Sequence, residues 1–73
     1  MMTRYAFVVF WSDEDGAWVA DAPDLRSCSA YGGTPEEAVA ELRIAIKAWL
    51  ETARARGLPI PQPRFRPQLA AAE

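Results

Sequence analysis

Apolar side chains recur at helical spacing in the second half of the chain, between residues 35 and 56. They form one stripe made of Val39, Leu42, Ala45, Ile46, Trp49, Leu50 and Ala53. The charged residues of this stretch lie mostly off the stripe. Gly57 supplies a stop, and Arg54 and Arg56 suit the negative end of a helix dipole. The pattern predicts one helix of about six turns, from Pro35 to Arg56.

The residues around position 34 specify where this helix begins. Thr34 can cap the first turn with its hydroxyl, and Pro35 has no amide to leave unsatisfied at the first helical position. Glu37 completes a capping box, in which its carboxylate should accept a hydrogen bond from the amide of Thr34. Glu36 and Glu37 also lie at the positive end of the helix dipole.

The first third of the chain predicts strands. Two runs of β-branched and aromatic residues, Tyr5–Trp11 and Ala17–Ala22, flank an acidic turn that ends in Gly16. Glycine adopts the positive φ that a tight turn needs, so the two runs should pair as an antiparallel hairpin. Cys28–Tyr31 can add a short third strand. We therefore expect an α+β fold in the order β-β-β-α, with a mainly antiparallel sheet of three or four strands and the helix on one face.

The segment after the helix has prolines at every second position: Pro59, Pro61 and Pro63. In an extended strand these prolines remove amide donors from one edge only, so the segment can serve as a fourth, edge strand that resists further pairing. A polyproline II linker accounts for the same pattern equally well. We expect residues 1–67 to form one domain and residues 68–73 to be a frayed tail.

The order and spacing of these motifs resemble the HicB-like antitoxin domain from Tyr5 to about Pro63. The matching positions are Asp15-Gly16, Trp18-Val19-Ala20, Pro23-Asp24-Leu25, Cys28, Gly32, Thr34, Glu37-Ala38 and Pro59-Ile60-Pro61. Arg26-Ser27 departs from the family pattern, which usually has Pro-Gly there. The positions expected to carry the structural motif are Gly16, Pro23, Asp24, Gly32, Thr34 and Glu37.

The resemblance implies a partial ribonuclease-H-like fold. It also implies a protein that neutralises a small, basic HicA-like endoribonuclease toxin by covering its active or RNA-binding surface. The usual carboxy-terminal DNA-binding module of the family is not expected here. We therefore expect no direct binding to nucleic acid.

Length and charge narrow the range of functions further. A chain of 73 residues forms a single domain that buries only about 60% of its unfolded surface, and self-association is a common remedy. The net charge is −2, with an acidic body and four arginines after residue 53, which suits a basic protein partner better than a nucleic acid. No run is long enough to span a bilayer, so we expect a cytoplasmic protein without a membrane partner.

Residues that could support catalysis are few. The sequence has no histidine, which removes the commonest general base and separates this chain from the HicA-like toxins, whose RNA cleavage is attributed to a histidine. Cys28, the only cysteine, is expected to be a buried apolar residue and not a reactive thiol. The turn 13–15 lacks the further ligands of a calcium loop, and Asp21 and Asp24 lack those of a two-metal site. We expect no enzyme, no metal and no cofactor, and we interpret the cations of residues 64–66 as solvated.

The aromatic residues indicate a protein interface. In the first strand one face carries Tyr5, Phe7, Val9 and Trp11, and the other carries Ala6, Val8 and Phe10. One helix covers only one of these apolar faces, so the other is covered by the segment after Gly57 or contacts a protein. The residues that we expect in contact with a toxin or a second copy are Phe7, Trp11, Trp18 and Ile60. The alternative function is a stand-alone homo-oligomeric module with another protein or ligand partner.

Overall fold

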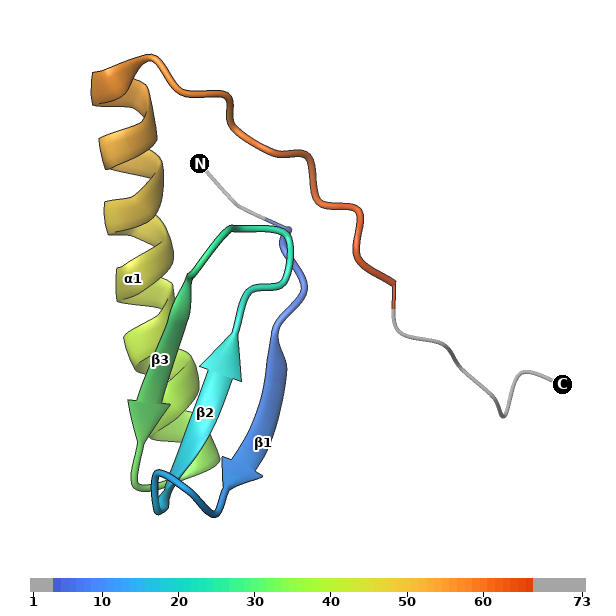
Figure 1. Cartoon of the computed structure of the whole chain (residues 1–73), viewed down its shortest axis with the longest axis vertical. Helices are drawn as coiled ribbons and strands as arrows, with labels where there is room; N and C mark the ends of the chain where they lie inside the picture. The colour runs from blue at the N-terminus through green and yellow to red at the C-terminus, as the bar shows by residue number, and fades with distance from the viewer. Residues whose placement is uncertain (1–3, 67–73) are drawn as a thin grey trace, which may run out of the picture.

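Over the described part of the chain, three strands and one helix make up the fold. The computed structural model describes residues 4–66. β1 (Val8–Ser12), β2 (Ala17–Asp21) and β3 (Ser29–Gly32) form an antiparallel sheet in the order β1-β2-β3, and α1 (Pro35–Arg56) packs across one face of it (Figure 1). The predicted α+β fold in the order β-β-β-α is confirmed. Residues 4–66 contain no fourth strand, because the proline segment pairs with no other strand. The expected frayed residues 68–73 lie outside the described part of the chain.

The helix has the predicted bounds and is capped at both ends. The hydroxyl of Thr34 accepts a hydrogen bond from the amide of Glu37 at 3.1 Å. The carboxylate of Glu37 accepts from the amide of Gly33 at 2.9 Å, one residue earlier than the capping box predicts. At the other end Gly57 has a φ of 69°, and the amides of Gly57 and Leu58 donate to carbonyls of the last turn, as in a Schellman motif. Over residues 4–66 no helix is both long and apolar enough to cross a membrane.

The strands differ from the prediction by up to three residues at their ends. β1 begins at Val8, because its partner in the ladder, Asp21, is the last residue of β2. The chain then enters the loop 22–28, which leaves nothing for earlier residues to pair with. Tyr5 and Phe7 therefore lie outside the ladder and pack against the core instead. β3 lies one residue further along the chain than predicted.

Small side chains on the sheet allow α1 to approach closely. The buried core consists of Ala20, Ala22, Leu25, Cys28, Ala30, Ala38, Leu42, Ile46 and Leu50. The sheet therefore supplies alanines beneath the helix, and the helix supplies the larger aliphatic residues. At the end of β3 a Cβ added to Gly32 would lie 2.5 Å from the backbone nitrogen of Ala38, so only glycine fits at this position.

The segment after α1 is held by two contacts with the body. The hydroxyl of Tyr5 donates to the carbonyl oxygen of Pro61 at 2.5 Å, and the Asp24 carboxylate accepts from the amides of Arg64 and Phe65, both at 3.1 Å. Burial and the nearby Asp24 carboxylate raise the pKa of Tyr5. Residues 58–66, referred to below as the tail, lie on the β1 side of the sheet, away from β3 (Figure 1).

The core and the cap should respond differently to truncation. Leu42 is fully buried, so Leu42→Ala should lower the free energy of unfolding by about 2–5 kcal/mol, since the cavity adds to the lost transfer energy. Thr34→Ala removes one capping bond and should cost about 1 kcal/mol. Chemical denaturation measures both. Equal losses at the two sites would contradict this account of the core.

Ser27 is the one residue other than glycine with a positive φ among residues 4–66, at 56°. The resemblance places glycine here, and glycine adopts this conformation without the steric cost that a Cβ brings. Ser27→Gly should therefore stabilise the fold by about 0.5–1 kcal/mol in chemical denaturation. Ser29→Gly in β3 is the matched control and should destabilise it. A loss of stability in Ser27→Gly would show that the loop does not carry this strain.

Cys28 should be chemically inert in the folded protein. Its side chain is 3% exposed, and burial, with a smaller contribution from the Asp21 carboxylate, raises the pKa of the thiol. A raised pKa leaves less of the reactive thiolate at any given pH. A colorimetric thiol reagent at pH 8 should therefore react with Cys28 only after denaturant is added. Rapid reaction of the native protein would show that this part of the core opens.

Candidate functional site: the two edges of the sheet

β1 and β3 are the edge strands, and hydrogen-bond alternation defines what each presents outward. The amide of Ala22 donates to the carbonyl of Cys28 at 3.0 Å, and Ala20 pairs with Ala30 two residues along the same ladder. Every second residue of an antiparallel strand bonds to a given neighbour. The residues of β3 whose backbone groups face outward are therefore Ser29 and Tyr31. The same alternation on the other side of β2 leaves two outward-facing residues on β1, Val9 and Trp11.

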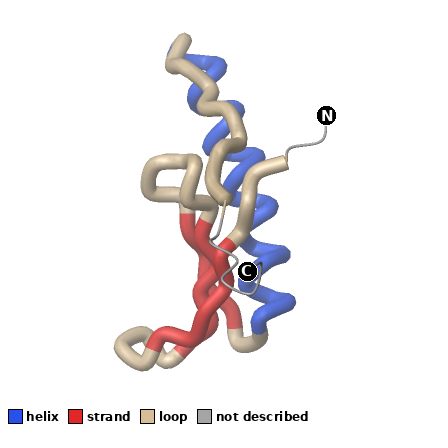
Figure 2. The backbone as a smooth tube through the Cα atoms, turned by 90° about the vertical axis from the view of Figure 1, so that its right-hand side faces the viewer, coloured by secondary structure: helices blue, strands red, loops and turns tan. Residues whose placement is uncertain are grey.

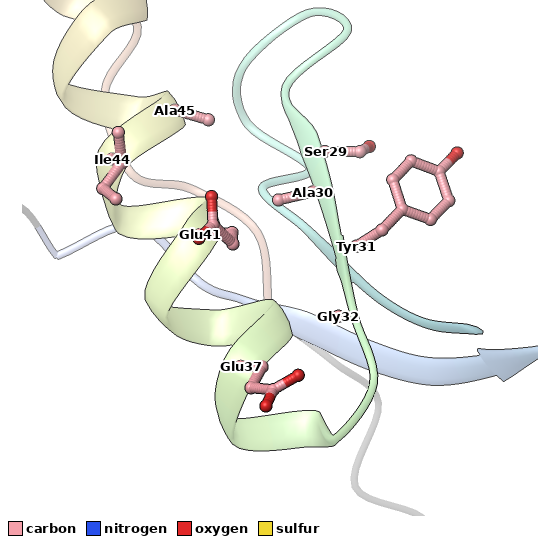
Figure 3. A pocket seen from close by; sticks show the side chains of 8 residues that line it. All are labelled: Ser29, Ala30, Tyr31, Gly32, Glu37, Glu41, Ile44 and Ala45. Atoms are coloured by element: carbon pink, nitrogen blue, oxygen red, sulfur yellow. The ribbon is translucent and has the colours of Figure 1, made fainter.

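A groove of about 720 Å³ runs between β3 and α1 (Figure 3). It is lined by Ser29, Ala30, Tyr31, Gly32, Glu37, Glu41, Ile44 and Ala45. From the helix, Glu41 and Ala45 point toward the strand, whereas Tyr31 projects to the side of β3 away from α1. Ile44 is 64% exposed, and the Glu37 carboxylate is already bonded to the Gly33 amide. The groove thus combines a strand edge, one exposed aliphatic side chain and the Glu41 carboxylate.

The face of the sheet opposite α1 is apolar and uncovered by the helix. Phe10, Val19 and Tyr31 pair in register across the three strands. Val19 is 6% exposed because its larger neighbours flank it, whereas Phe10 and Tyr31 are 46% and 53% exposed. Figure 2 shows α1 on one side of the strands only. This row is the uncovered apolar face that the sequence predicts.

The four residues predicted at an interface fall into different environments. Phe7 and Trp18 are half-buried against the core, and the Arg43 guanidinium lies 5.4 Å from the ring centre of Phe7. Trp11 is 47% exposed. Its ring meets that of Trp18 edge to face at 5.7 Å. Ile60 is exposed on the tail. The role of these residues in an interface stays a prediction, with Trp11 and Ile60 offering the most surface.

Sequence reasoning did not name Phe10, Tyr31 and Ile44 as interface residues, although they are among the most exposed large apolar side chains. The exposure of Ile44 could have been predicted, since it is an aliphatic residue outside the apolar stripe of the helix. Phe10 was assigned to the correct face of β1, but the sequence did not show which face α1 would cover. No comparable sequence pattern indicated that Tyr31 would be exposed.

Four of the five carboxylates considered for metal binding, all but Glu14, are engaged in local structure. Asp15 is bonded to Ser12 within the hairpin turn, and Asp13 accepts from the Trp11 indole at 2.8 Å. Asp21 accepts from the hydroxyl of Ser29 at 2.6 Å, and Asp24 holds the tail. Within residues 4–66 no group of three or more His, Cys, Asp or Glu residues is placed to hold a metal ion.

Two curated proteins share this sequence pattern. The UPF0150 protein Ta0767 of Thermoplasma acidophilum is 34% identical over 55 residues, which cover 75% of this chain and 80% of that protein. The UPF0150 protein ssl0259 of Synechocystis sp. is 39% identical over 54 residues, which cover 74% of each. No family model matches the chain, and no solved structure does. The extent and identity of these two alignments show that the chain belongs to the UPF0150 family.

Proposed function

We propose that this protein is a HicB-type antitoxin module, which neutralises a HicA-like endoribonuclease by covering its active or RNA-binding surface. Its role is binding, in the cytoplasm, with no catalysis of its own. The motif order that resembles the HicB-like domain supports the proposal. The two UPF0150 relatives share the sequence over about three quarters of this chain, but the toxin partner is proposed from the resemblance and not from their names.

The groove between β3 and α1 is the observation that carries the proposal. Its strand edge presents the backbone groups of Ser29 and Tyr31, which can pair with an extended segment of a partner by strand addition. Beside that edge, the Glu41 carboxylate suits a lysine or arginine of the partner, and Ile44 suits an apolar side chain. Together these features would suit an extended segment of a small basic protein.

Charge supports the same kind of partner. The chain carries a net charge of −2, and a basic toxin would be drawn to it from a distance. Such attraction speeds association more than it sets affinity. The affinity would then depend on strand pairing and on burial of Ile44, since a few buried anchor residues dominate most interfaces.

The test starts from the neighbouring gene, where the proposal expects a short, basic, histidine-containing protein; the absence of such a gene would favour the stand-alone module. Co-expression should relieve the growth arrest that the neighbouring protein causes, and calorimetry should detect binding of the purified pair. Ile44→Arg places a cation in the groove and should weaken binding at least about tenfold. Ala55→Arg is the matched control, because it adds the same charge to an exposed site about three turns along α1 and should leave the affinity unchanged.

Two results would contradict the proposal. If growth arrest persists although both proteins are soluble, the stand-alone homo-oligomeric module with another partner replaces it. If Ile44→Arg and Ala55→Arg bind equally well, the toxin contacts another surface and the groove is not the site.

A further inference from the structure

The β1 edge is unprotected. From Val8 to Ser12 the strand contains no charged residue and no proline, and its four apolar side chains are 36–47% exposed. Edge strands of soluble proteins usually carry a charge, a proline or a bulge that prevents pairing with another chain. Within residues 4–66 no other segment pairs with this edge. A strand of this kind is a template for a further strand.

We propose that the further strand is β1 of a second copy of this chain. The two strands would be antiparallel about a two-fold axis at Phe10, which makes one continuous six-stranded sheet from two three-stranded ones. In this register Val9 lies opposite Trp11 of the second copy. Both are the outward-facing residues of the edge, so each pair exchanges both of its backbone hydrogen bonds. The whole of β1 overlaps with its mate, and the two Phe10 side chains meet on the uncovered face.

A hollow beside the β1 edge is placed to receive a side chain of the second copy in this register. It has a volume of about 330 Å³ and is lined by Val9, Pro35, Glu36 and Val39, on the face of the sheet that α1 covers. Trp11 of the second copy lies directly opposite Val9 on that face, next to the mouth of the hollow. Seating its ring there would bury an indole that is 47% exposed in the single chain.

The charges at the two ends of β1 favour the antiparallel arrangement. The hairpin turn at one end carries Asp13, Glu14 and Asp15. The Val8 end has Arg4 and the tail arginines Arg64 and Arg66 beside Asp21 and Asp24. A two-fold axis at Phe10 brings the acidic turn of one copy to this more cationic end of the other. Pairing through β3 would instead bring the carboxylates of both grooves together, so β1 is the edge that suits a second copy.

Cross-linking tests the register, independently of any toxin. Residues facing each other in a pair without hydrogen bonds have Cα atoms about 4.5 Å apart, which a disulfide can span. Phe10→Cys should therefore form a covalent dimer on mild oxidation. Tyr31→Cys is the matched control, because it is exposed on the same face at the other edge and should not cross-link. Wild-type protein, whose Cys28 is buried, should also stay uncross-linked.

A proline variant tests the edge itself. Light scattering should give twice the 8.1 kDa chain mass at micromolar concentration. Val9→Pro removes an outward amide that forms no bond within the chain, so the fold should persist while the dimer dissociation constant rises about thirtyfold, as expected from two lost hydrogen bonds. Val8→Pro is the control, since it removes an amide inside the ladder and should destabilise the monomer as well.

Three results would overturn the inference. The first is a monomer across the whole micromolar range in light scattering. The second is a dimer in which Tyr31→Cys forms the cross-link and Phe10→Cys does not. The third is a Val9→Pro variant that folds and dimerises with unchanged affinity. If Val9→Pro does not fold, the cross-linking pair decides the question alone.

Discussion

The close approach of α1 to the sheet is the constraint on which the rest of the structure depends. Alanines at positions 20 and 30 form the surface beneath the helix, and Gly32 touches the backbone at Ala38, where no Cβ fits. Such a sheet surface leaves room for Leu42 and its aliphatic neighbours but none for a large aromatic ring. Phe7, just before β1, and Trp18 of β2 therefore lie at the rim of the core. The thin core and the aromatic rings at its rim have one cause.

This constraint also explains how much the sequence could predict. The helix bounds follow from local chemistry, because Thr34, Pro35 and Gly57 act within one turn, and they are confirmed. Which face of β1 would meet α1 was not predictable, since both faces are apolar and alternation only groups residues by face. The start of β1 depends on where β2 ends, which is a non-local fact. The contact of Glu37 with the Gly33 amide likewise depends on the close packing of β3 against the helix.

The two edges of the sheet differ in charge and length, so they would bind different partners. β1 is uncharged from Val8 to Ser12, so it suits an identical strand that pairs antiparallel about Phe10. β3 is shorter, and Glu41 on the adjacent helix repels a second copy while attracting a basic partner. The preference of each edge for its partner arises from the strand together with the helix turn beside it, and not from one residue. These neighbours are far apart in the sequence, and only the packing places Val39 beside Val9 and Glu41 beside β3.

Self-association and partner binding would also be compatible in space. β2 separates the two edges, so a second copy on β1 leaves the groove at β3 open. A dimer joined at β1 would then present one groove at each outer end of its sheet, and its two-fold symmetry makes those grooves equivalent. Burying β1 adds apolar contact that the alanine-lined core does not supply, and anything that binds only the folded state stabilises it by mass action. The same small side chains that bring α1 close to the sheet would thus make the stability of the fold depend on its partners.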